Sequence, residues 1–111
     1  MEFSQSLKEN YEFRRIYSRG KSDVGPYMVV YCRKNGRGIN RVGITASTKL
    51  GHAVVRNRLR RRLREIYRLN EDRLLAGYDV VIVARHRAIG AKFSAMNDEF
   101  MRHAAKLGIT R

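Results

Sequence analysis

Apolar residues recur at helical spacing in three segments of the chain. The clearest segment is residues 53–70, where one stripe consists of Val55, Leu59, Leu63, Ile66 and Tyr67. Residues 94–107 have a second stripe, with Ser94 as the expected cap and Gly108 as the stop. A shorter stripe lies within residues 1–20, where Ser6 or Asn10 would cap the helix and Gly20 would end it. The pattern therefore predicts three helices.

Three other segments have the pattern of strands. Side chains alternate in residues 22–34, residues 39–48 follow a turn signal at 35–38, and residues 79–84 are continuously apolar. A continuously apolar strand is typical of a central position covered on both faces. We expect 39–48 to run antiparallel to the first strand and to form a parallel βαβ unit with helix 53–70 and strand 79–84. The order is then αββαβα, in one domain spanning residues 1–111.

The predicted helix at 53–70 is strongly cationic. Seven arginines lie between His52 and Arg68, against a single acid, Glu65. Most of them lie opposite the apolar stripe; Arg62 falls beside it, so its stem should pack while its head reaches water. Arginine binds phosphate bidentately, whereas an ordinary solvated face mixes lysine with glutamate. A membrane-surface helix would need an exposed apolar face. We therefore interpret this face as a polyanion-binding surface.

Composition limits the remaining possibilities. The 111 residues have a net charge of +14, and 43% of them are hydrophobic, which is too many for a disordered basic tail. There is no apolar run of membrane-spanning length and no secretory segment at the start, so we expect a cytoplasmic protein. Cys32 is the only cysteine, which excludes a disulfide and favours a small core residue.

The first predicted strand has an aromatic face. Met28, Val30 and Cys32 share the core face, and the other face consists of Tyr27, Val29, Tyr31 and Arg33. Such a face can stack single-stranded bases while a cation holds phosphate. Alternatively, a helix packs over these tyrosines. From periodicity alone, Phe13 and Tyr17 of the first helix are better explained as core residues.

Signatures of catalysis are sparse. The three histidines, at 52, 86 and 103, are scattered, the acids are dispersed, and there is no phosphate-binding GxxxxGK[ST] loop. The residues themselves predict a nucleic-acid-binding protein that does not hydrolyse its ligand. An arginine helix beside an aromatic strand favours structured RNA with an adjacent single-stranded segment over DNA.

The segment Arg56-Asn57-Arg58, with Arg60, Arg61 and Arg64, resembles the RNR signature of the protein subunit of bacterial ribonuclease P. The similarity begins at Arg41-Val42-Gly43-Ile44 and runs through Lys49-Leu50-Gly51. The segments 10–13, 26–31 and 79–85 resemble the family as well, so the likeness covers nearly the whole chain. It implies an α+β two-layer sandwich of the ribosomal protein S5 domain 2-like type with a left-handed βαβ crossover. Sequence rules alone predict a right-handed one.

The resemblance also implies a function. The RNA subunit would be the catalyst and would hold Mg²⁺, with no metal bound by the protein, and the holoenzyme would remove the 5′ leader of precursor tRNA. Contacts to the ribonuclease P RNA would be made by Arg56, Asn57, Arg58, Arg60, Arg61, Arg64 and Arg68. The leader would lie between the first helix and the sheet, against Phe13, Tyr17, Val29, Tyr31 and Lys49. This reverses the core interpretation of Phe13 and Tyr17.

The implied partners are ribonuclease P RNA and precursor tRNA, with no membrane and no obligate protein partner. Composition alone also allows a rival of another class, a non-enzymatic RNA-binding protein such as a ribosomal protein or an RNA chaperone. A third possibility is a nuclease that acts without RNA.

Overall fold

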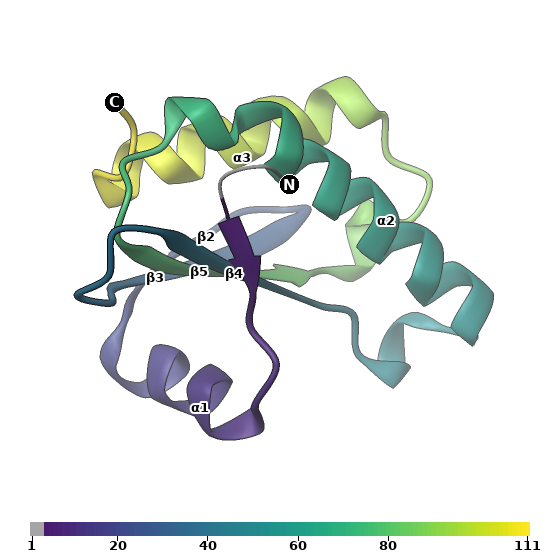
Figure 1. Ribbon diagram of the computed structural model, residues 1–111. Coiled ribbons are helices and arrows are strands. Elements are labelled where there is room, and N and C mark those ends of the chain that lie inside the picture. Colours follow the sequence, from purple (N-terminus) through teal and green to yellow (C-terminus); the bar gives the residue numbers. More distant parts are fainter. Residues whose placement is uncertain (1–3) are drawn as a thin grey trace.

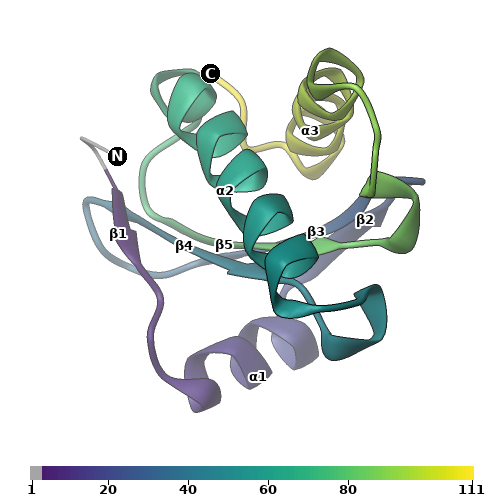
Figure 2. The same cartoon turned by 90° about the vertical axis from the view of Figure 1, so that its right-hand side faces the viewer.

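A five-stranded mixed sheet forms the centre of the computed structural model, which describes residues 4–111. Its strands are β1 (Ser4–Ser6), β2 (Lys21–Val24), β3 (Met28–Lys34), β4 (Asn40–Thr45) and β5 (Tyr78–Ala84). The helices are α1 (Asn10–Arg19), α2 (Ala53–Asn70) and α3 (Phe93–Leu107), with short 3-10 turns η1 (Thr48–Leu50), η2 (Glu71–Arg73) and η3 (His86–Ala88). Helix α1 lies on one face of the sheet, and α2 and α3 cover the other (Figures 1 and 2). The α+β class is thus confirmed, with α1 as an additional layer.

The strand order is β1-β4-β5-β3-β2. Strand β4 is parallel to β1 and to β5, while β3 is antiparallel to β5 and to β2. In Figure 2, α2 lies above the sheet, the carboxyl ends of β4 and β5 point towards the viewer, and β5 lies to the right of β4. The β4–α2–β5 crossover is therefore left-handed, as the family resemblance implied and against the usual preference.

One strand prediction was wrong. The segment 22–34 is two antiparallel strands, β2 and β3, because Gly25-Pro26 interrupts the ladder. Strand β4, within 39–48, runs antiparallel to β3 as expected, but the two strands are not neighbours because β5 lies between them. Strand β5 has buried residues on both faces, so the central position removes more apolar surface from water than an edge would. Strand β1 was not predicted, because its sequence Ser-Gln-Ser has no apolar alternation.

The helix boundaries follow the prediction closely, whereas two caps differ. Ser6 belongs to β1, so it does not cap α1. Instead, the helix begins with a capping box between Glu9 and Glu12. Helix α3 begins at Phe93, one residue before the expected cap Ser94. Both predicted stops are confirmed: the N–H of Gly20 donates to the carbonyl of Ile16, and Gly108 has a left-handed conformation with φ of 75°.

The main core lies between the sheet and the α2–α3 layer. It contains the predicted core face of β3, the alternate residues of β5 and the buried stripes of both helices, including Met28, Val30, Cys32, Leu59, Leu63, Ile66, Tyr67, Val80, Ile82, Met96 and Phe100. Cys32 is a buried free thiol, as expected. A smaller core of Leu7, Ile16 and Val81 lies under α1.

Within residues 4–111, none of the helices has the length and apolarity needed to cross a bilayer.

An ion network holds α1 on the sheet. Arg41 of β4 pairs with Glu12 of α1 and makes two hydrogen bonds of 2.8 Å with Asp79 of β5. Burial alone would raise the pKa of Asp79, but the hydrogen bonds from Arg41 and Asn35 outweigh burial and lower it. Next to this network, the ring of Phe13 covers Gly43, where a Cβ would come within 2.4 Å of the ring. These contacts fix the position of α1 over β4 and β5.

A buried polar cluster ties α3 to the β2–β3 connection. The imidazole of His103 lies 2.6 Å from Asp23 and 3.0 Å from Glu99. The carboxylate of Glu99 also accepts hydrogen bonds from the backbone N–H groups of Tyr27 and Met28. Each buried acid in the cluster is therefore hydrogen-bonded, and the bend between β2 and β3 has a fixed position.

The end of α1 depends on the absence of a side chain at Gly20. A Cβ there would lie 2.6 Å from the carbonyl oxygen of Ile16 and 2.7 Å from that of Cys32, and neither backbone atom can rotate away. We expect Gly20→Ala to lower the free energy of unfolding by about 1–3 kcal/mol, as overpacking does.

The matched control is Gly38→Ala, because a Cβ at Gly38 meets nothing within 4 Å. Chemical denaturation of both variants measures the difference. Equal free energies of unfolding for the Gly20→Ala and Gly38→Ala variants would show that α1 and β3 leave room for a side chain at Gly20.

Candidate nucleic-acid interface

Helix α2 presents its arginines away from the sheet. Leu59, Leu63 and Ile66 are buried against the main core, and the opposite side of the helix faces solvent (Figures 1 and 2). The predicted RNA-contacting residues that are exposed on this side are Asn57, Arg58, Arg61, Arg64 and Arg68. The apolar stripe thus determines which way the arginine face points.

Three arginines of α2 are held by neighbouring carbonyl groups. Arg56 donates to the carbonyl of Gly51 at 3.2 Å, and Arg60 donates to Ala46 O at 3.1 Å and to Asn57 Oδ1 at 2.9 Å. The guanidinium of Arg62 donates to Ala91 O at 2.7 Å. Its head was expected to reach water, but the loop before α3 supplies an acceptor. Arg56, Arg60 and Arg62 thus help to hold α2 against its neighbours.

The outer arginines have no such partners. In the described part of the chain, the side chains of Arg58, Arg61 and Arg64 make no hydrogen bond and no ion pair. The one acid of the helix, Glu65, binds Arg68, whose hydrogen bond lowers the pKa of the Glu65 carboxyl. The outer face therefore has several cations without a counter-charge, which is the electrostatic character of a phosphate-binding surface.

Aromatic side chains of α1 and β3 meet on the other face of the sheet. The ring centroids of Phe13 and Tyr17 are 6.5 Å apart, and those of Tyr17 and Tyr31 are 4.9 Å apart in an edge-to-face arrangement. Val29 lies on the same face of β3 as Tyr31. We call Phe13, Tyr17, Val29 and Tyr31 the aromatic cleft. The structure thus brings together four of the five predicted leader-binding residues.

The accessibility of these four residues differs. Tyr17 is 39% exposed, whereas Tyr31 and Phe13 are partly buried against the small core under α1. Burial raises the pKa of the Tyr17 phenol, and a hydrogen bond with Thr45 only partly offsets this. Tyr17 therefore stays neutral near pH 7 and combines an accessible ring with a polar hydroxyl. The alternative that a helix packs over these tyrosines is confirmed in part, because α1 covers some of the tyrosine surface. Base stacking on this face stays a prediction.

An open hollow of about 440 Å³ borders the aromatic cleft. Besides Phe13 and Tyr17, it is lined by Asn10, Arg14 and Thr45, which sequence reasoning did not assign to a site. Helical spacing could have indicated Asn10 and Arg14, since they lie seven and three residues before Tyr17. Thr45 could not have been found in this way, because its position beside α1 depends on how the helix crosses the sheet.

Lys49 does not line this hollow. It is exposed in η1, beyond the carboxyl end of β4. Because β4 and β5 are parallel, their carboxyl ends lie at the same edge of the sheet, which places Lys49 and the start of α2 on the same side as Arg85. His52 is the N-cap of α2 and makes no side-chain capping bond. This edge therefore has cations between the aromatic cleft and the arginine face.

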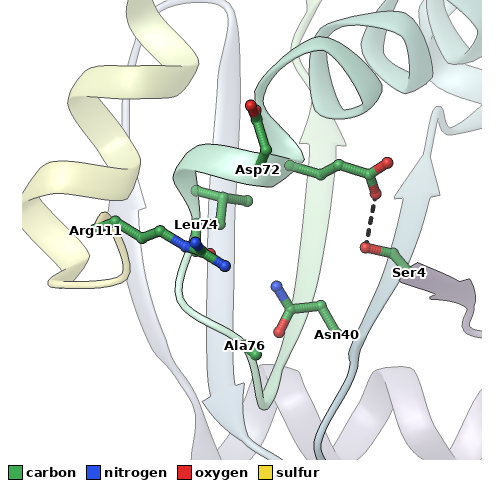
Figure 3. A pocket seen from close by; sticks show the side chains of 7 residues that line it. Ser4, Asn40, Asp72, Leu74, Ala76 and Arg111 are labelled. Carbon is green, nitrogen blue, oxygen red and sulfur yellow. Dashed lines mark hydrogen bonds between the residues drawn. The ribbon is translucent and has the colours of Figure 1, made fainter. Parts of the chain in front are cut away.

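A different hollow, of about 180 Å³, lies near the other end of α2 (Figure 3). Its lining includes Glu71 and Asp72, and Ser4 donates a hydrogen bond of 2.9 Å to Glu71. Asn40 donates to Leu75 O and accepts from the N–H of Tyr78. These contacts join β1 and β4 to the chain after α2. Two acids and one cation, Arg111, line this hollow, so it lacks the positive charge of a polyanion site. Across residues 4–111, no group of three or more His, Cys, Asp or Glu residues is arranged to hold a metal ion.

Comparison with known proteins gives a consistent result. A family model described as Ribonuclease P matches residues 1–108. The ribonuclease P protein component of Lachnoclostridium phytofermentans is 45% identical over 104 residues, which cover 94% of this chain and 89% of that protein. The corresponding protein of Natranaerobius thermophilus is 42% identical over 101 residues, covering 91% and 88%.

Solved structures agree with the sequence relatives. The ribonuclease P protein of Staphylococcus aureus superposes with a TM-score of 0.85 at 30% identity, covering 96% of this chain and 97% of that one. The protein from Thermotoga maritima gives 0.80 at 32% identity, covering 88% and 93%. The chain therefore belongs to the ribonuclease P protein family, the protein components of a tRNA-processing ribonucleoprotein endonuclease.

Proposed function

We propose that this chain binds the catalytic RNA subunit of ribonuclease P through α2 and the 5′ leader of precursor tRNA in the aromatic cleft. In this proposal the two ligands occupy opposite faces of the sheet, and the cations at the carboxyl edge of β4 and β5 lie between them. The observation that carries the proposal is the outer face of α2, with its unpaired arginines.

The RNA-subunit contact would comprise Arg56, Asn57, Arg58, Arg60, Arg61, Arg64 and Arg68. Support comes from the difference between arginines that are already hydrogen-bonded within the protein and arginines that are not. Arg56 and Arg60 already donate to backbone carbonyl groups, so their heads are held in place before RNA arrives. Arg58, Arg61 and Arg64 are free to form bidentate contacts with phosphate. Displacing counterions from RNA would supply much of the binding free energy and make it depend on salt.

The leader would pass over the aromatic cleft. Tyr17 offers an accessible ring on which a base can stack, and Tyr31 and Phe13 support that ring from below and beside it. Base–aromatic stacking contributes about 1–3 kcal/mol per base and tolerates different sequences, which suits leaders that vary. Arg14 beside the cleft and Lys49 at the edge would neutralise the leader's phosphates.

The chemistry would reside in the RNA subunit, which would hold the Mg²⁺ ions. Support from this chain lies in the ion pairs that several of its carboxylates form within the protein. Glu12 and Asp79 bind Arg41, Glu65 binds Arg68, and Asp23 and Glu99 bind His103. These carboxylates have structural partners, so the protein's contribution would be to bind and position RNA.

Reconstitution tests the proposal against a non-enzymatic RNA-binding protein and against a nuclease that acts alone. The chain is mixed with a bacterial ribonuclease P RNA and precursor tRNA at low Mg²⁺. We expect cleavage only when both subunits are present. Cleavage that is unaffected by the protein would contradict the proposal, and cleavage by the protein without RNA would indicate an independent nuclease.

Arg64→Ala is the cleanest test of the α2 contact, because Arg64 is exposed and its loss breaks no bond within the protein. We expect weaker binding to the RNA subunit and a slope of log K against log salt that is smaller by about one unit. Arg102→Ala, an exposed cation on α3, is the matched control. Identical slopes for the two variants would exclude α2 as the contact surface.

Tyr17→Ala tests the aromatic cleft with less disturbance of the core than a change at Tyr31. We expect the holoenzyme to bind precursor tRNA more weakly by roughly 1–3 kcal/mol while its affinity for mature tRNA stays unchanged. Tyr17→Phe should retain the stacking, and Tyr11→Ala removes an exposed ring of the same helix that does not line the hollow by the cleft. Equal losses for both tRNA forms would assign Tyr17 to packing alone.

A further inference from the structure

Four cations surround a hollow of about 210 Å³ at the end of β3 that is remote from Val29. Arg19 comes from the end of α1, Lys21 from the start of β2, and Arg33 and Lys34 from the end of β3. We call this group the basic pocket. Buried Cys32 and Leu107 also line it, and Tyr78 adds a half-buried ring with a hydroxyl group.

The four cations have no counter-charge. Within residues 4–111, none of their side chains forms a hydrogen bond or an ion pair. Asp79 lies opposite Arg33 in the β3–β5 register, but Arg41 and Asn35 bind its oxygens. The group of Glu12, Arg41 and Asp79 has a net charge of −1, against four positive charges. The remaining excess charge favours a bound anion.

Backbone packing keeps the cations close together. Because Gly20 has no side chain, the end of α1 lies against the carbonyl of Cys32, and Arg19 and Lys21 enter the pocket from either side of this contact. Lys21 lies directly opposite Cys32 in the β2–β3 register, so the two side chains share one face of the sheet, and both line the pocket. The convergence is thus a product of the fold and does not come from a run of lysines and arginines.

We propose that the basic pocket binds backbone phosphates of RNA at a second site, distinct from the arginine face of α2. Guanidinium forks, lysine ammonium groups and a tyrosine hydroxyl are the donors that proteins use for phosphate. The pocket is lined by residues from the ends of α1, β3 and α3 and by no residue of α2, and α1 lies on the face of the sheet opposite α2 (Figure 1), so the two surfaces contact different parts of the bound RNA. The inference rests on the proposed function for the identity of its polyanion.

Two RNA segments could supply the phosphates. Val29 in the aromatic cleft and Arg33 are four residues apart on one strand, about 13 Å, so a long leader could extend from the cleft to the pocket. Alternatively, the RNA subunit itself reaches this end of the sheet. In either case the recognised chemistry is the sugar–phosphate backbone.

The test is a double variant, Arg19→Gln with Lys34→Gln, compared with Arg73→Gln with Arg102→Gln. All four residues are exposed, and each pair removes two positive charges. Binding is measured as a function of salt in two formats. One uses the RNA subunit alone, and the other uses the holoenzyme with precursor tRNA whose leader either ends within the aromatic cleft or extends well beyond it.

We expect the pocket variant to reduce the slope of log K against log salt by about 1.5–2 units relative to the control variant in at least one format. A loss confined to the long leader assigns the phosphates to the leader, and a loss with the RNA subunit alone assigns them to that subunit. Slopes equal to those of the control in both formats would overturn the inference. Arg64→Ala is measured in parallel. If the basic pocket does not bind RNA but the proposed function holds, Arg64→Ala still reduces the salt slope. If the proposed function itself fails, Arg64→Ala leaves the slope unchanged as well.

Discussion

Burial of one stripe of α2 is the interaction on which the other features depend. Like charges four residues apart each destabilise an isolated helix by a few tenths of a kcal/mol. Burying a side chain such as Leu59, Leu63 or Ile66 stabilises the fold by about 1.5–3 kcal/mol, so packing outweighs the repulsion. The same packing turns the charged side outward. The helix can therefore hold a density of arginine that it could not maintain alone in water.

The opposite face of the sheet is organised by a smaller set of contacts. The pairing of Arg41 with Glu12 and Asp79 fixes α1, and the fit of Phe13 onto Gly43 brings the helix close to the sheet. Since α1 covers only part of that face, Tyr17 stays accessible while the residues below it are packed. A fixed helix beside an open sheet surface gives the aromatic cleft its shape without requiring a flexible loop.

The positive charge of the chain is divided among separate surfaces. The outer side of α2 suits a structured RNA, the edge beyond β4 and β5 adds cations beside the aromatic cleft, and the basic pocket lies at the other end of β3. The acids near two of these surfaces are bound by cations, Asp79 by Arg41 and Glu65 by Arg68, and the remaining cations are in excess. In the proposed function, such a division of charge would allow this small domain to contact RNA from several sides.

Local sequence patterns were enough to predict the three helices and most of the α2 surface. Helical periodicity gives the limits of 53–70, and the same periodicity places Arg61 and Arg64 opposite the buried stripe, since both depend only on local geometry. Features that depend on contacts between distant segments do not follow from these local patterns. The insertion of β5 between β3 and β4 and the meeting of Arg19 with Lys34 in one pocket both join segments far apart in the chain, and the left-handed crossover was expected from the family resemblance alone. Such arrangements are set by which packing buries the most apolar surface, and a one-dimensional pattern does not contain that information.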